Sequence, residues 1–189
     1  MAALKGKVIV WSEDLDSKDC PFNISIDGTD FRANEKKHPR YNQDNKDCSQ
    51  KFNHGALKYK IGLSIWEACC VWINGPYQGG KSDLEIFRDR SRHKLKPWNM
   101  VVCDRGYQSS EPFEEMVLRV PSGTDSKELA KFKSRARLCH ETFNGRLKTY
   151  KILANTYRHA RAKHRFVLEA ITVTVQYEMD NGSPIFDVL

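Results

Sequence analysis

Three acidic residues occupy positions from which carboxylates could do chemistry together. Asp27 and Asp104 each end an apolar run that is typical of a strand, and Glu141 lies in a long basic stretch with almost no other acid. Ligands of α/β sheets collect where strands end, and a carboxylate beside a buried strand is costly to desolvate unless it meets a cation. Two aspartates and a glutamate at one sheet edge would hold two hard divalent cations. Such metals activate a water or a 3′-hydroxyl at a phosphodiester.

Each of these acids also has an ordinary explanation. Asp27-Gly28 and Asp104-Arg105-Gly106 are turn signatures, because aspartate and glycine tolerate the backbone conformations of tight turns. Glu141 could form a routine helical ion pair with Arg137, four residues before it, or with Arg146. Spacing alone therefore leaves both an active site and three unrelated surface acids open.

Hydrophobic periodicity predicts the strands that would position the acids. Five apolar runs have the length of strands, at residues 23–27, 59–66, 68–73, 100–103 and 116–120. The second and third form a predicted hairpin. Gly28-Thr29 is predicted to end the first strand, and Asn74-Gly75-Pro76 to break the chain after the hairpin.

Helices are predicted after the hairpin and in the C-terminal third. The first begins at Ser82-Asp83, an N-cap pair, and the others span 127–152 and 158–179. This order of elements predicts an α/β fold with a mixed five-stranded sheet and helices on both faces. The RNase H-like fold has this order, and composition does not distinguish it from other α/β folds.

Charge is distributed unevenly along the 189 residues. The net charge is +7, but residues 127–165 alone carry twelve Lys or Arg and two Glu, so the rest of the chain is mildly acidic. This asymmetry indicates a surface for a polyanion such as nucleic acid; the alternative is a basic helix that only aids solubility. The longest apolar run has six residues, 68–73, which excludes a membrane span. Six cysteines without a C-x-x-C pair argue against a zinc ribbon.

Several motifs occur in an order that resembles a known family. They are DGTDF from Asp27, LKYKIGLSI, VWINGPYQGGKSDLEIFR, VVCDRGY, RARLCHETFNGRLK, and the run from Tyr157 that ends in FDV. Over about residues 22–189 this series resembles the DDE superfamily endonuclease domain of Harbinger-type transposases. The resemblance implies an RNase H-like fold and an Asp-Asp-Glu metal site.

The resemblance assigns a role to each acid. Asp27 is the first acid, in the aspartate-glycine-threonine motif, and Asp104 is the second, in the aspartate–x–glycine–tyrosine motif. Glu141 is the third, with 36 residues between it and Asp104, and it shares a helix face with Arg137 and Lys148. Asp83 is a rival for the second acid and a further candidate metal ligand, placed behind Asp104 because helix capping would explain it.

The expected function is a metal-dependent DNA endonuclease and strand transferase with two Mg²⁺ or Mn²⁺ ions. The residues expected to contact DNA are Arg137, Arg146, Lys148, Lys151, Arg158 and Arg161, with Arg137 and Lys148 facing phosphate or orienting Glu141. The alternative is a decayed or domesticated, non-catalytic DNA- or protein-binding module on the same fold. A basic RNA-binding structural protein is a weaker alternative, because it leaves the acids unexplained.

The domain organisation is expected to be one catalytic domain at 22–189 after a truncated or frayed segment at 1–21. Transposases of this type carry a helix-turn-helix region before the first acid, so we expect the chain to be a fragment without it. The expected partners are DNA, a separate DNA-binding protein and a second copy of the chain, with no membrane. The expected location is the nucleus, or the cytoplasm of a prokaryote.

Overall fold

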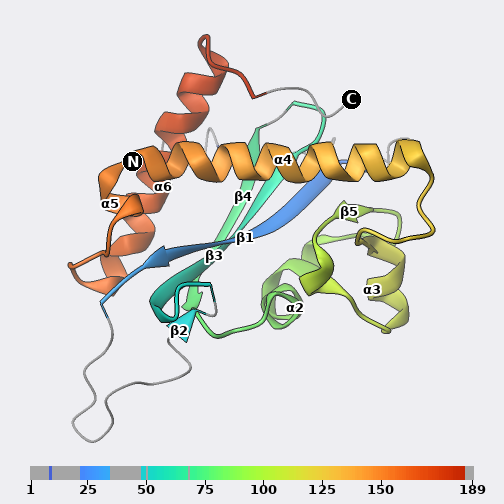
Figure 1. Ribbon diagram of the computed structural model, residues 1–189, viewed down its shortest axis with the longest axis horizontal. Helices are drawn as coiled ribbons and strands as arrows, with labels where there is room; N and C mark the ends of the chain where they lie inside the picture. Colours follow the sequence, from blue (N-terminus) through green and yellow to red (C-terminus); the bar gives the residue numbers. More distant parts are fainter. Residues whose placement is uncertain (1–8, 10–21, 35–47, 50, 68, 186–189) are drawn as a thin grey trace, which may run out of the picture.

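The computed structural model of the chain describes residues 9, 22–34, 48–49, 51–67 and 69–185 (Figure 1). Apart from Ile9, the predicted N-terminal segment 1–21 lies outside the described residues. The strands are β1 (Ile24–Arg32), β2 (Cys48–Ser49), β3 (His54–Ser64), β4 (Cys70–Gln78), β5 (Val101–Val102) and β6 (Leu118–Arg119). The α-helices are α2 (Asp83–Ile86), α3 (Pro112–Val117), α4 (Lys127–Thr149), α5 (Lys151–Ala154) and α6 (Arg161–Asp180). The chain also contains a short π-helix, η2 (Phe87–Ser91), and two short 3₁₀ helices, η3 (Arg92–Lys94) and η4 (Arg105–Tyr107).

The predicted mixed α/β fold is confirmed. β1 is antiparallel to β3 over its whole length and parallel to β5, and β5 is parallel to β6. Within the described residues the sheet has six strands in the order β2-β3-β1-β5-β6, with β4 also paired to β3. The predicted count of five was wrong because the two-residue β2, which lies outside the five predicted runs, also pairs with β3.

The first strand continues past the predicted stop at Gly28-Thr29. Gly28 lies opposite Lys60 in the antiparallel ladder, and pairing continues to Arg32 opposite Ala56. The turn signature was misleading because the neighbouring strand satisfies the backbone hydrogen bonds that a local turn would otherwise take up. On its other edge, β1 pairs with β5 only at Ile24 and Ser25. The rest of β1 therefore extends beyond the end of β5.

Two other local predictions were wrong. β4 runs through Asn74-Gly75-Pro76 instead of ending there, with a register shift opposite residues 58–60. Gly75 has a φ of 137°, and a Cβ there would lie 2.6 Å from the Tyr59 ring, so the strand passes only because this residue is glycine. In the predicted strand 116–120, Met116 and Val117 end helix α3, and only Leu118–Arg119 forms a strand.

The predicted long helices are confirmed in position. Ser126 caps α4 by accepting a hydrogen bond from the Leu129 amide at 3.2 Å. The β-branched run 171–175 lies inside α6, as the helical periodicity predicted. Among the described residues, no helix is both long enough and apolar enough to cross a bilayer, and the five described cysteines are free thiols.

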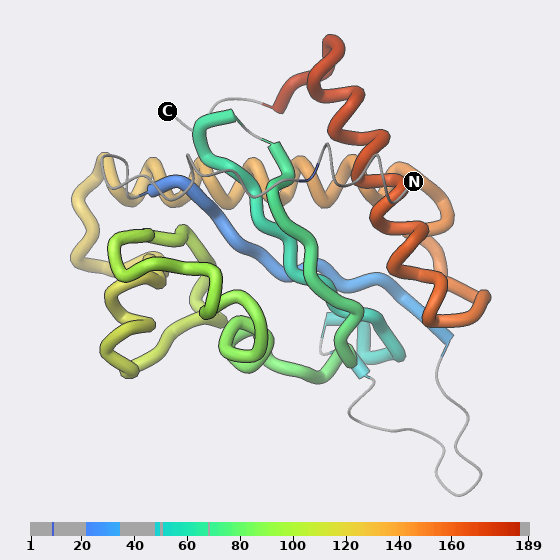
Figure 2. Tube along the Cα trace, turned by 180° about the vertical axis from the view of Figure 1, so that it is seen from behind, coloured from blue at the N-terminus to red at the C-terminus, as the bar shows by residue number. Residues whose placement is uncertain are grey.

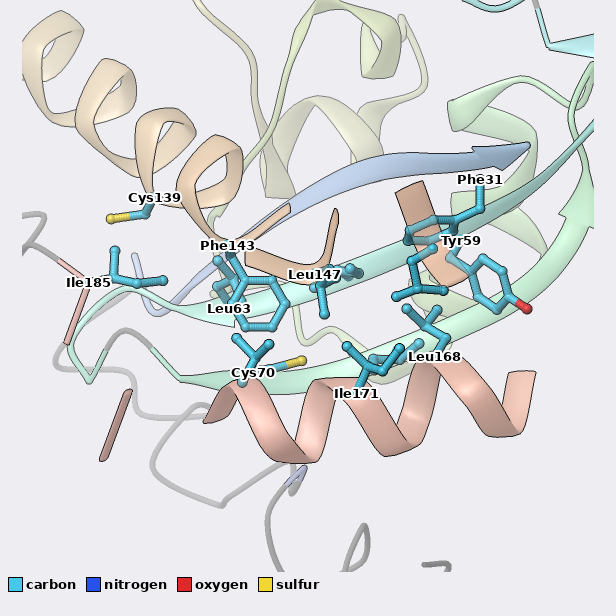
Figure 3. Packing of buried hydrophobic residues seen from close by; sticks show 14 of the residues in the cluster. Phe31, Tyr59, Leu63, Cys70, Cys139, Phe143, Leu147, Leu168, Ile171 and Ile185 are labelled. Carbon is cyan, nitrogen blue, oxygen red and sulfur yellow. The ribbon is translucent and has the colours of Figure 1, made fainter. Parts of the chain in front are cut away.

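Two hydrophobic clusters cover the two faces of the sheet. On one face, β3 packs against α4, α5 and α6. Figure 3 shows Phe143 and Leu147 of α4 together with Leu63 of β3 and Leu168 of α6 in this cluster. On the other face, Ile24, Ile26 and Trp72 pack against Phe87 and Tyr107 from the segment that leads from α2 to α3. Figures 1 and 2 show α4 as a long rod across the strands. This rod forms one wall of the site described next.

Candidate active site

A cavity of about 900 Å³ lies along β1, beyond the point where its pairing with β5 stops. Its walls come from β1, from the loop after β5, from one face of α4, and from the segment Gly79–Asp83 that leads into α2. These segments are far apart in the sequence. The sheet topology therefore joins at one place the side chains that the sequence analysis selected separately.

All three predicted catalytic acids line this cavity. Asp27 comes from β1, Asp104 follows β5 at the start of η4, and Glu141 projects from α4 with an exposed side chain. Asp83, the first residue of α2, lines it as well. In the described part of the chain, however, no three His, Cys, Asp or Glu side chains are arranged to hold one metal ion. The acids share a cavity without forming a preassembled metal cluster.

The electrostatics of Asp104 indicate surplus negative charge in the cavity. Burial raises the pKa of its carboxyl group, and the neighbouring charges of Asp27 and Asp83 raise it further. A hydrogen bond from the Gly106 amide to Asp104 Oδ1, at 2.9 Å, acts in the opposite direction. Carboxylates that disfavour one another's ionisation are stabilised by a cation between them. The oxygen donors thus suit Mg²⁺ or Mn²⁺ in their chemistry.

Asp83 does not have the capping role predicted for it. The N-cap of α2 is Ser82, whose hydroxyl accepts from the Glu85 amide at 3.3 Å while the Glu85 carboxylate accepts from the Ser82 amide at 2.9 Å. The carboxylate of Asp83 forms an ion pair with Lys60 instead, and lies 3.6 Å from Lys58 Nζ. The sequence could not show this pair, because its partners lie 23 residues apart on different elements.

Lys60 is a fully buried cation beneath the acids. Its side chain is 0 % exposed, and its Nζ lies 4.6 Å from the centre of the Tyr107 ring as well as against Asp83. Burial lowers the pKa of Lys60, while the charges of Asp83 and Asp27 support its protonated form. A buried ammonium is stable only with such partners. Asp83 therefore has a partner cation within the protein, which distinguishes it from Asp104.

The glycines of the two aspartate motifs leave room for this ion pair. A Cβ on Gly28 would lie 2.8 Å from Lys60 Nζ and 3.2 Å from Asp83 Oδ1. A Cβ on Gly106 would lie 3.1 Å from Asp104 Oδ1 and 3.2 Å from Asp83 Oδ2. Both motif glycines are therefore explained by the close approach of neighbouring side chains. Gly28 does not form a turn.

Gly28→Ala should lower the free energy of unfolding by about 1–3 kcal/mol, the usual cost of overpacking. The new methyl group would displace Lys60 Nζ, which cannot move freely because Asp83 holds it. Urea denaturation measures the change. The matched control is Gly145→Ala, which also lines the cavity but has open space around its Cβ and should be stabilising by up to ~1 kcal/mol in a helix. Equal denaturation midpoints for Gly28→Ala and wild type would contradict the tight packing of the ion pair.

Cations gather along the cavity beside the acids. Lys148 and Arg137 line it on the same face of α4 as Glu141, and Lys51 and Lys58 line it from the β2–β3 region. Burial lowers the pKa of Lys148, and the charge of Lys51 lowers it further. Two ammonium groups that repel each other in this way favour an anion between them. The cavity thus combines a group of acids with a group of lysines.

The other basic residues predicted to contact DNA lie elsewhere. Arg146 donates hydrogen bonds to the carbonyls of Ser183 and Pro184, the latter at 2.9 Å, and does not line the cavity. Lys151 and Arg158 line a separate, smaller cavity. Arg161 begins α6 and lines neither cavity. The six predicted residues thus do not form one surface around the acids.

Several residues of the cavity were missed by sequence reasoning. His140 and Asn144 line it from α4. His140 lies three residues after Arg137, and Asn144 lies three after Glu141, so their helical spacing would have identified them. The His140 side chain is buried, which lowers its pKa, while the charge of Asp27 acts in the opposite direction. Lys51 carries no comparable signal in the sequence.

Comparison with known proteins gives one match. Residues 26–176 match the family model described as DDE superfamily endonuclease. No curated protein and no solved structure matches the chain.

Proposed function

The chain belongs to the family of DDE superfamily endonucleases, and we propose that it is a DNA endonuclease and strand transferase that depends on divalent metal ions. We propose further that it is of the Harbinger type and has an RNase H-like fold. The observation that carries the proposal is the shared cavity of Asp27, Asp104 and Glu141, three acids from separate elements. The raised pKa of Asp104 supports it, because it marks a place where a cation is favoured.

Asp27, Asp104 and Glu141 would hold two Mg²⁺ or Mn²⁺ ions. When bound, such ions lower the pKa of a water and stabilise charge on the leaving oxygen of an in-line displacement. Asp83 is assigned a different role, because its ion pair with Lys60 already neutralises it. Together, Asp83 and Lys60 position the strand and loop that carry Asp27 and Asp104.

The lysines of the cavity would bind the DNA backbone. Lys148 and Lys51 lie close enough to repel each other, and a phosphate of the cleaved strand would relieve that repulsion. Arg137, one helical turn before Glu141, would contact phosphate or orient the Glu141 carboxylate. One phosphodiester of the DNA would lie next to the acids, and the adjacent phosphate would lie at the lysines. A water would then be aligned to attack the phosphodiester, and cleavage would release a 3′-hydroxyl that could take part in strand transfer.

Sequence recognition is proposed to come from outside this cavity. Phosphate contacts position DNA but carry no sequence information. We therefore propose a separate DNA-binding partner protein, and a second copy of the chain for the two ends of a DNA segment. A DNA substrate implies action in the nucleus, or in the cytoplasm of a prokaryote.

A second candidate function is a non-catalytic DNA-binding module on the same fold. The observation that favours it is that the acids are not gathered around one point within the described residues. A binder would retain the basic surface, which does not depend on the acids.

A supercoiled plasmid distinguishes the two functions. We expect conversion to nicked and linear forms with Mg²⁺ or Mn²⁺ and none in EDTA, because the carboxylates need cations to act. Cleavage that persists in EDTA would contradict the metal-dependent mechanism. Retained plasmid binding without cleavage in either metal would favour the non-catalytic module.

A further inference from the structure

A second cavity lies where β1 ends. It has a volume of about 450 Å³ and is lined by Arg32 of β1, by residues of α5 including Lys151, and by the segment 155–159. We call it the corner cavity. Its lining residues come from the end of β1, from α5 and from the segment after α5, and Figure 1 shows where these elements lie. None of these residues lines the cavity that holds the acids.

The corner cavity is strongly basic. Arg32, Lys151 and Arg158 contribute three positive charges, and Asn155, Thr156 and His159 add polar groups. None of the described residues that line it is acidic. An anion in this cavity would therefore meet only cations and neutral groups, which is the condition for binding phosphate.

The backbone around the corner cavity is held in place. The Tyr157 amide donates to the Arg32 carbonyl at 2.8 Å, and the Asn34 amide donates to the Tyr157 carbonyl at 3.2 Å. The Tyr157 side chain is buried and packs edge-on against His164, with ring centres 4.7 Å apart. These contacts attach the segment that carries Arg158 and His159 to the end of β1. The cations thus surround a preformed hollow.

The position of the corner cavity relates it to the acids. Asp27 and Arg32 lie five residues apart on β1, a separation of about 16 Å at the usual rise of a strand. Lys148, which lines the acid cavity, lies near the end of α4, and Lys151, which lines the corner cavity, begins α5. At about 3.4 Å per base pair, the two cavities are separated by roughly five base pairs of DNA.

We propose that the corner cavity binds a phosphate of the substrate DNA, about five base pairs from the phosphodiester at the acids. This inference rests on the proposed function for the substrate, but the cavity itself does not depend on the metals. It would add a second contact with the DNA backbone to the one at the lysines of the acid cavity. The DNA is then held at two points, which fixes its direction across the acids.

The test compares two charge-matched double variants for DNA binding. Lys151→Gln with Arg158→Gln removes two cations from the corner cavity, and both side chains are exposed. The control, Lys127→Gln with Lys131→Gln, removes two exposed cations from the start of α4 that line neither cavity. Fluorescence anisotropy with a labelled 20-base-pair duplex in EDTA measures affinity without cleavage.

The corner variant should lose about tenfold or more in affinity, and the control less than about threefold. The slope of log affinity against log salt should become shallower by about 0.9 for the corner variant only, which is the change expected when one phosphate contact is lost. Equal losses and slopes in both variants would overturn the proposal, because they would reflect net charge alone. A larger effect on duplex RNA than on DNA would overturn the assignment of DNA.

A charge-preserving variant separates the site from a folding defect. Lys151→Arg with Arg158→Lys should bind the duplex within about twofold of wild type. Loss of binding in this variant, with an unchanged melting temperature, would also contradict a purely phosphate-directed cavity. The anisotropy assay contains no metal, so its result can be interpreted even if the protein does not cleave plasmid. The corner cavity and the nuclease assignment can therefore fail separately.

Discussion

Asp104→Asn should abolish metal-dependent cleavage and leave DNA binding unchanged or tighter. Asparagine keeps the shape of the side chain but removes one negative charge from the acids that would hold the cations. Loss of a group that merely supports a metal ligand costs about 10–100-fold in metal affinity or activity, so loss of a direct ligand should exceed that. Glu141→Gln should act in the same way from the opposite wall.

Three measurements check this expectation independently. The plasmid assay reports cleavage, and the rise in melting temperature on adding Mn²⁺ reports metal binding to the folded protein. Both should be lost in Asp104→Asn, whereas anisotropy in EDTA should show equal or tighter DNA binding because repulsion of phosphate is reduced. The matched control is Glu128→Gln, an exposed acid on α4 that does not line the cavity.

The outcome that would contradict the assignment is specific. Cleavage that survives Asp104→Asn but disappears in a folded Asp83→Asn would make Asp83 the second acid. The ion pair of Asp83 with Lys60 argues against this, because a carboxylate bound to an internal ammonium has less charge to offer a metal.

Asp83→Asn should lower the free energy of unfolding by about 3 kcal/mol, the usual cost of leaving one partner of a buried ion pair alone. Lys60 is 0 % exposed, and its ammonium group would lose its main partner. For a domain of this size the melting temperature should fall by about 6–12 °C. Lys60→Met should cost less, because Asp83 is 23 % exposed and remains near Lys58. The double variant should lie closer to wild type than Asp83→Asn does, since replacing both partners removes the unpaired charge.

The pH dependence of Asp83→Asn gives a second check. The pKa of Lys60 is lowered from its ordinary 10.5 in the folded protein, and without Asp83 it should be lower still. Between the folded and unfolded pKa values the unfolded state binds more protons, so stability rises with pH. The deficit of Asp83→Asn should therefore shrink between pH 7 and pH 10 in denaturation experiments. A melting temperature equal to that of wild type at pH 7 would show that the ion pair contributes nothing to stability.

The sequence by itself determined the order and type of most elements. The helical periodicity of residues 127–152 and 158–179 and the alternation around Ile24 depend on nearest neighbours along the chain, and these elements are confirmed. The choice of Asp27, Asp104 and Glu141 rested on motif order and strand ends. Their meeting in one cavity depended on the fold, because Asp27 lies within β1 just beyond its pairing with β5, Asp104 follows β5, and Glu141 comes from α4.

Tertiary structure alone decided the features that depend on pairing between distant segments. Gly28 continues a strand because β3 lies beside it, and Asp83 forms an ion pair because Lys60 of β3 lies beneath it. Arg146 faces the C-terminal segment while Lys148, two residues on, faces the acids. A backbone or a charge satisfies its hydrogen bonds with whatever group the fold brings near. Local sequence therefore predicts which groups are present, and only the fold decides which of them pair.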